Sequence, residues 1–313
     1  MPVVSKVSPT AAVSPGVRDR RWAALYVLCA GILMVILDGT IVNVALPTIQ
    51  RDLGFSQSNL AWVVNSYLIA FGGLLLLAGR LGDLLGRKRV LLAGLAVFTL
   101  ASLLGGLSTS SGMLIAARFI QGIGGALSSA VALGMIVTMF PEPREQARAF
   151  GVYSFVASAG ASIGLLAGGI LTQLISWHWI FFVNVPIGIV AALLSLRLLE
   201  SDRRLGLSQG ADVIGAALVT AGLMVGVYSI VETAQYGWTS PQTLGGGGLS
   251  ILLLGGFVWR QATAKNPLLP LSVLRPRNVW GANLVQFLLV AGMLGFFFMS
   301  SLYLQRVLGL NPL

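Results

Sequence analysis

Two ionisable side chains lie inside long apolar runs of this sequence, and these two are the residues best placed to do chemistry. Asp38 lies within Trp22–Leu46, and Arg118 lies within Met113–Phe140. An ionised side chain in an apolar helix costs roughly 2.5–3.5 kcal/mol on insertion scales, so such a residue is a functional candidate by default. A carboxylate can take up and release a proton, whereas a guanidinium keeps its charge. These residues therefore predict proton handling, or an ion pair, in an apolar environment.

The elements that must position these charges are membrane-spanning helices. Hydrophobic residues make up 56% of the 313 residues and charged residues 10%, whereas a soluble domain carries about 25% charged residues. About 20 mostly apolar residues are needed to cross about 30 Å of hydrocarbon. The sequence predicts an all-α polytopic membrane protein, a bundle of about nine transmembrane helices. The eighth of these, Leu244–Trp259, has the weakest helix signal, because its four consecutive glycines are poor helix formers. The nine are Trp22–Leu46, Asn59–Ala78, Val90–Leu107, Met113–Phe140, Ala149–Ile175, Trp179–Leu199, Val213–Val231, Leu244–Trp259 and Val279–Leu304.

The basic residues predict the orientation of these helices. Of the 20 Lys and Arg residues, 17 fall on the N-terminal side of the predicted membrane, while Arg51 and Arg306 fall on the other side and Arg118 falls within a span. Such an excess is typical of cytoplasmic loops. We expect a multi-pass protein of the cell membrane with a cytoplasmic N-terminus, residues 1–21 forming a disordered tail. The net charge of +10 is explained by these loops, and nucleic-acid binding is not expected because the bases lack a solvated face shared with aromatic residues.

A glycine-rich basic connection joins the second and third predicted helices. Gly82 and Gly86 allow close helix approach and a tight reversal. Asp83 is placed to form an ion pair with Arg87 one helical turn later. Taken alone, a positively charged loop with turn glycines would explain this segment equally well. The residues that we single out there, as a predicted gating loop, are Gly79, Gly82, Asp83, Gly86, Arg87, Lys88 and Arg89.

Four segments, in order along the chain, resemble motifs of the major facilitator superfamily, and specifically of its fourteen-helix drug:proton antiporters. They are Leu37–Pro47, similar to the first-helix motif; Gly79–Arg89, similar to the loop signature; Arg118–Gly125, similar to the fourth-helix motif linked to proton coupling; and Trp177–Gly188, similar to the entry to the sixth helix. The resemblance implies a secondary transporter that exports lipophilic small molecules in exchange for protons. It implies the proton gradient as energy source, the lipid bilayer as surroundings, and no catalytic residue, cofactor or metal.

The resemblance also implies an organisation of the chain. It places an N-terminal six-helix half of two inverted three-helix repeats at residues 22–205, two additional helices at 206–265, and the first helix of a truncated C-terminal half at 266–313. Because it covers nine of fourteen helices, we expect the chain to be truncated and inactive alone. The missing C-terminal half is then the expected partner, and an apolar or glycine-lined wall is expected to lie uncovered.

The fifth predicted helix departs from the antiporter pattern. The family has a Gly-Pro pair before its closing Gly-Gly, whereas this chain reads Gly164-Leu165-Leu166-Ala167-Gly168-Gly169, so a proline kink is not expected. Gly160, Gly164 and Gly168 are four residues apart and form one smooth face for helix packing, which Gly169 adjoins. We expect this face to serve packing.

His178 stands where the family has Arg, and is expected at the membrane interface. Cys29 is expected to be a small buried hydrophobe.

The two charges are predicted to meet. Asp38 lies sixteen residues after Trp22, about 24 Å deep and roughly 6 Å from the outer boundary, and Arg118 lies five residues after Met113, about 7–8 Å below that boundary. We predict that Asp38 alternates between an ionised state paired with Arg118 and a protonated state. A static ion pair that clamps two helices is the alternative for the pair.

For the chain, the alternatives are a transport-dead fragment or membrane interaction module, and a metabolite importer of the same fold.

Overall fold

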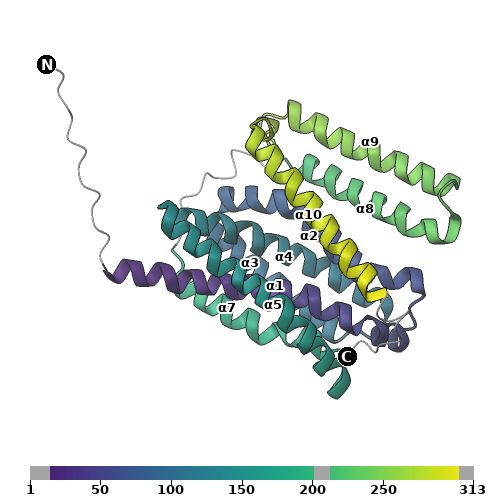
Figure 1. Ribbon diagram of the computed structural model, residues 1–313, viewed down its shortest axis with the longest axis horizontal. Coiled ribbons are helices and arrows are strands. Elements are labelled where there is room, and N and C mark those ends of the chain that lie inside the picture. The colour runs from purple at the N-terminus through teal and green to yellow at the C-terminus, as the bar shows by residue number, and fades with distance from the viewer. Residues whose placement is uncertain (1–14, 201–211, 303–313) are drawn as a thin grey trace.

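The computed structural model describes residues 15–200 and 212–302, and in both parts the chain forms a bundle of helices (Figure 1). Eight helical segments in these parts are long and apolar enough to cross a membrane, with α6 and α7 together forming one of them. The elements are α1 (Pro15–Leu53), α2 (Gln57–Leu85), α3 (Arg87–Gly106), α4 (Ser111–Met139), α5 (Pro143–Leu174), α6 (Trp179–Phe182), α7 (Asn184–Leu198), α8 (Val213–Tyr236), α9 (Pro241–Thr263), the 3₁₀ helix η2 (Leu271–Leu274) and α10 (Arg277–Leu302).

These helices match the predicted segments, with differences at their ends. The predicted tail is wrong for residues 15–21, which belong to α1, and residues 1–14 lie outside the described part. Helix α5 likewise begins at Pro143, six residues before the predicted Ala149. Proline is accepted in the first turn because the amide that it lacks has no helical partner there. The ninth predicted helix is α10, whose last two predicted residues, 303 and 304, are not described.

Local sequence signals explain where several helices begin and end. Gly86 separates α2 from α3 with a φ of 96°, a backbone conformation that side chains with a Cβ rarely adopt. The hydroxyl of Ser110 accepts a hydrogen bond from the Met113 amide and caps α4. Ser240 caps α9 in the same way and Pro241 opens it, so the four glycines lie within a helix despite their poor propensity.

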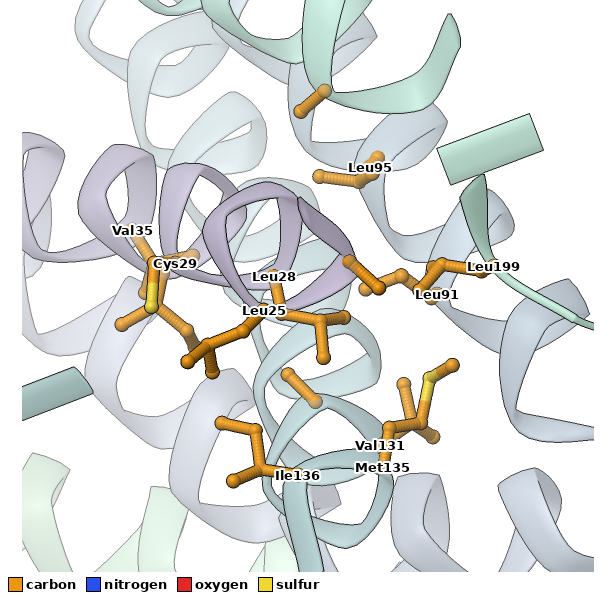
Figure 2. Close-up of a cluster of buried hydrophobic side chains, with 14 of the residues drawn as sticks. Leu25, Leu28, Cys29, Val35, Leu91, Leu95, Val131, Met135, Ile136 and Leu199 are labelled. Atoms are coloured by element: carbon orange, nitrogen blue, oxygen red, sulfur yellow. The ribbon is translucent and has the colours of Figure 1, made fainter. Parts of the chain in front are cut away.

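The first helix lies at the centre of the six-helix part. One apolar core cluster joins α1 to α3, α4 and the end of α7. The cluster includes Cys29, which is 2% exposed, so the expected buried role is confirmed. Figure 2 shows how side chains from these helices converge; it labels Leu25, Leu28, Cys29, Val35, Leu91, Leu95, Val131, Met135, Ile136 and Leu199. Helices α8 and α9 form a hairpin at one side of the bundle, where α8 packs on α2 (Figure 1).

The glycine face of α5 packs against α1, and this corrects one expectation. A Cβ on Gly160 would lie 2.6 Å from Leu33, one on Gly168 would lie 2.9 Å from the Ile41 carbonyl, and one on Gly164 would collide with Thr40. The prediction of a packing role is confirmed for these three residues. The alternative of a glycine-lined wall left uncovered is wrong, because α1 already covers it. Exposed apolar side chains on α5 include Phe155, Leu166 and Leu174.

Candidate functional site

Asp38 and Arg118 form a buried ion pair at the centre of the bundle. The Arg118 Nη1 donates to Asp38 Oδ2 at 2.5 Å, and the side chains are 1% and 0% exposed, respectively. The expected meeting of these residues is thereby confirmed. Removing two charges from water costs several kcal/mol for each ion, and the cost is recovered only when further hydrogen bonds satisfy both partners. The contacts around this pair therefore decide what it can do.

Gln121 bridges the two charges from one turn along α4. Its Oε1 accepts from Arg118 Nη1 at 2.7 Å, and its Nε2 donates to Asp38 Oδ1 at 2.6 Å. The same Nε2 donates to the hydroxyl of Ser102 on α3 at 2.8 Å. The amide thus presents its carbonyl to the cation and its NH₂ group to the carboxylate. Both ends of Gln121 are occupied, so its orientation is fixed by the charges that it touches.

Asn184 approaches Asp38 from the beginning of α7. Its Nδ2 donates to Asp38 Oδ1 at 2.9 Å, and the residue is fully buried. Val183 separates the short α6 from α7, and Pro186 has no amide hydrogen to offer the carbonyl four residues earlier. This interruption places the first residue of α7 in the bundle interior. The Oδ1 of Asn184 is buried and finds no hydrogen-bond partner among the described residues.

Arg118 is anchored to α2 independently of Asp38. Its Nε donates to the Val63 carbonyl at 3.0 Å. Its guanidinium carbon lies 4.3 Å from the centroid of the Tyr67 ring, a cation–π distance. Close approach of α4 makes this possible, because a Cβ on Gly122 would lie 2.9 Å from Ala70 on α2. Arg118, Asp38, Gln121 and Asn184 are called the central cluster below, and they join α1, α4 and α7, with α2 and α3 in support.

Gln121 and Asn184 were not among the site residues predicted from the sequence, although both lie in segments that carried the family resemblance. A signal was present for each. Gln121 follows Arg118 by three residues and so shares its helix face. Asn184 is an amide in an apolar span, where an unpaired polar group is expensive. Spacing within one helix could have found Gln121; only the fold could have shown that Asn184 reaches Asp38.

The basic connection between α2 and α3 binds two neighbouring helices. Asp83 pairs with Arg87 at 3.2 Å, as predicted. Arg87 Nη1 also donates to the Gly134 carbonyl at 2.9 Å, and Lys88 Nζ donates to the Leu196 carbonyl at 2.9 Å. These cations lie near the last turns of α4 and α7, where the helix dipole favours positive charge. The connection therefore holds the six-helix part together, a role that does not require a second half.

The remaining predicted residues of this connection make fewer contacts. Gly82 is buried, and a Cβ there would lie 2.6 Å from Val131. Gly79 has open space around its Cα hydrogen, and Arg89 is exposed. His178 lies away from the central cluster; its Nδ1 is 2.7 Å from the Ser176 hydroxyl and its ring stacks on Trp177 with centroids 3.8 Å apart. Its interfacial role stays a prediction.

An apolar pocket of about 350 Å³ lies between α2, α4 and α8. Its wall includes Trp62, Phe119 and Met224. The Ser66 hydroxyl also lines it, is buried, and has no hydrogen-bond partner in the described parts of the chain. Pockets of roughly 300–1,000 Å³ with few polar groups are typical of sites for small lipophilic ligands.

Comparison with known proteins identifies the family. The sequence model of the Major Facilitator Superfamily matches residues 28–313. This chain therefore belongs to that superfamily of transporters, and it is a multi-pass membrane protein. The fold expected from the four motifs is confirmed by the helical bundle and by this match.

Curated relatives narrow the comparison. The puromycin resistance protein pur8 of Streptomyces alboniger is 43% identical over 311 residues, which is 99% of this chain and 61% of that protein. The cephamycin export protein CmcT of Amycolatopsis lactamdurans is 41% identical over 91% of this chain and 59% of its own length. The tetracenomycin C resistance and export protein of Streptomyces glaucescens is 35% identical over 95% of this chain and 55% of its own length. The chain thus spans about three fifths of the length of these relatives.

Proposed function

We propose that this chain supplies the N-terminal part of a secondary transporter that exports lipophilic drug-like molecules in exchange for protons. The observation that carries the proposal is the central cluster, a carboxylate and a guanidinium fully buried in a transporter fold. The names of the relatives support export and drug resistance, and the apolar pocket beside α4 suits a lipophilic substrate. The proton gradient across the cell membrane would supply the energy, with no cofactor.

The geometry suggests how one proton could change the bundle. Protonation of Asp38 removes the ionic attraction to Arg118 at 2.5 Å. Arg118 keeps the Val63 carbonyl, the Gln121 carbonyl and the Tyr67 ring, so it stays on α2 and α4. Helix α1 is then the element released, because its charged contact to α4 is the one that is lost. Neutralising Asp38 would thereby allow α1 to move relative to α4.

Transport by a completed protein tests the proposal. The chain is co-expressed with the C-terminal segment of the Streptomyces alboniger relative that extends beyond the matched region; this pair is called the completed transporter below. In inverted vesicles with an acidic lumen, adding a lipophilic cation or puromycin should release protons, recorded with a pH-sensitive dye. Vesicles with the chain alone should show no release. Drug transport by purified chain in liposomes without a partner would contradict the expected dependence on a second half.

The same vesicles separate the alternatives. An importer would accumulate its solute in right-side-out vesicles and would give no drug-dependent proton release in inverted ones. A transport-dead fragment or interaction module would give neither signal, even with the completing segment. The cytoplasmic N-terminus is part of the proposal, since the exchange direction depends on it.

A further inference from the structure

We propose that Asn184 is the side chain that responds to the proton on Asp38: its amide turns by half a rotation, so that the carbonyl oxygen that has no partner in the described structure accepts a hydrogen bond from the protonated carboxyl. This inference rests on the proposed function for its role in transport, but its geometry is independent of transport. Asn184 would be a positioning residue, because it acts through Asp38.

The argument begins with where a proton can bind. Asp38 Oδ2 faces the Arg118 Nη1 at 2.5 Å, and a guanidinium can only donate. A proton on Oδ2 would therefore lie against a donor. Oδ1 faces two amide NH₂ groups, those of Gln121 at 2.6 Å and Asn184 at 2.9 Å. Only an amide can offer an acceptor instead of a donor by turning, so Oδ1 is the oxygen at which the protonated state can be accommodated.

The two amides differ in what turning would cost. Gln121 is held at both ends: its carbonyl accepts from Arg118 at 2.7 Å and its NH₂ group also donates to Ser102 at 2.8 Å. Turning Gln121 would direct its NH₂ group at the guanidinium, so a donor would face a donor, and the hydrogen bond from Arg118 would be lost. Asn184 is held by one hydrogen bond, to Asp38, and its carbonyl has no partner among the described residues. Turning Asn184 breaks only the bond that protonation has already weakened.

The proton balance of this step is simple. A hydronium ion delivers its proton to Asp38 Oδ1, an O–H bond forms, and water is released. The Asn184 N–H···Oδ1 hydrogen bond breaks, and an Asp38 O–H···O hydrogen bond to Asn184 Oδ1 forms. The Asn184 carbonyl, a buried acceptor without a partner among the described residues, gains a donor in this state, while its NH₂ group moves to the position that the carbonyl held. The unpaired oxygen is thus the acceptor available to the protonated carboxyl, and the orientation of one side chain on α7 follows the charge state of Asp38 on α1.

The test is infrared difference spectroscopy on the 313-residue chain, which does not require transport. Asparagine is isotope-labelled at the side-chain carbonyl carbon, and spectra are recorded as the pH is lowered. A protonated-carboxyl band that is absent in Asp38→Asn reports Asp38. We expect a labelled amide carbonyl band to shift together with it, and to be lost in both Asp38→Asn and Asn184→Leu. Asn283→Leu is the matched control, since Asn283 is exposed and donates to the Val279 carbonyl of its own helix, and this variant should keep the shift.

Each result has a clear reading. The inference is overturned if Asp38 takes up a proton while the asparagine band stays unchanged, or if the band still shifts in Asp38→Asn. It is equally overturned if labelled glutamine shifts instead, because Gln121 would then be the amide that turns. Failure of Asp38 to protonate across the accessible range would also overturn it. Failure of drug export alone, with the coupled shift intact, would count against the proposed function and not against this inference.

Discussion

The chain contains two clusters of similar residue types, one wholly buried and one whose arginine is partly exposed. The central cluster lies in the bundle interior. The second, called the hairpin cluster, consists of Asp212 at the start of α8 and Arg260 and Gln261 near the end of α9. There Asp212 accepts from Arg260 Nε at 2.7 Å and from Gln261 Nε2 at 2.9 Å. Both clusters thus combine a carboxylate with a guanidinium and an amide, yet they have different consequences.

The difference lies in what else the carboxylate can bind. Asp212 stands at the start of α8 and also accepts from the Gly215 amide at 2.9 Å, so the helix itself supplies a donor. Its arginine is 36% exposed. Burial acts to raise the pKa of Asp212, but the hydrogen bonds from Arg260, the Gly215 amide and Gln261 outweigh it and lower the pKa from its ordinary value of 3.8. The ionised state is therefore stable there, as expected for a structural cap.

Asp38 has no such local support, since it lies in the middle of α1. Its donors are side chains on α4 and α7. Every one of these bonds depends on how the helices are packed, and each can change when they move. A carboxylate that also accepts from the backbone of its own helix is suited to holding structure, whereas one satisfied only by three side chains of other helices is suited to switching.

The largest effect is expected at the central carboxylate. Asp38→Asn leaves Arg118 buried without a counter-charge, which costs about 3–5 kcal/mol, and it removes the exchangeable proton. Drug-dependent proton release by the completed transporter should be abolished, and the purified chain should lose thermal stability. The comparison predicts a much smaller change for Asp212→Asn, because asparagine caps helices about as well as aspartate.

The double change Asp38→Asn with Arg118→Gln decides between coupling and a static clamp. It removes both charges and leaves hydrogen-bonding side chains. If the pair only clamps two helices, this variant should pump at the normal rate with an unchanged dependence on the pH gradient. We expect it to recover stability but not proton-driven efflux.

The next effect separates the two arginines. In Arg118→Lys, one ammonium group must replace a planar guanidinium. That guanidinium donates to the Val63 carbonyl, Asp38 and Gln121 and lies over the Tyr67 ring. Proton-coupled transport should fall about tenfold, equivalent to about 1.4 kcal/mol. In Arg260→Lys it should change less than about twofold, because Arg260 is partly exposed and water can replace a lost contact. Equal losses in the two variants would contradict the distinction between the clusters.

The sequence predicts the central pair better than the hairpin cluster. Two charges in apolar runs, placed at one depth by helix rise, are a strong signal, and their meeting is confirmed at 2.5 Å. Asp212 directly precedes one predicted helix and Arg260 directly follows the next, and nothing in their spacing shows that two antiparallel helices bring them together. The expectation of an uncovered glycine-lined wall was wrong for the same reason: a smooth face predicts packing but does not identify the helix that it contacts.

A smaller effect is expected when the hairpin cluster is titrated. Asp212→Ala should lower stability by about 1–2 kcal/mol at neutral pH, since it removes a helix cap. Because the folded pKa of Asp212 lies below 3.8, its stabilisation is complete above that value and is lost as the pH falls through the folded pKa. Melting temperatures of the wild-type and variant chains should therefore converge in acid. A difference that stays constant below pH 3.8 would show that the charge of Asp212 contributes nothing.

The smallest change tests which side of the membrane each cluster approaches. Leu85 lies at the end of α2 beside the basic connection, and Thr239 lies in the short turn between α8 and α9. The excess of basic residues predicts that Leu85 is cytoplasmic and Thr239 external. The hairpin cluster, at the opposite ends of α8 and α9 from that turn, would then be cytoplasmic, whereas the central cluster is buried between the two sides.

Single cysteines are introduced as Leu85→Cys and Thr239→Cys; Cys29 is 2% exposed and serves as the unreactive background. An impermeant maleimide applied to intact cells should modify position 239 and spare position 85 until the cells are opened. Thr239 is exposed, so Thr239→Cys should change stability by less than about 0.5 kcal/mol, whereas Leu85 is half-buried against the core cluster and Leu85→Cys should cost more. The reverse labelling pattern would place the basic ends outside, and the exchange direction proposed for the central carboxylate would have to be inverted with it.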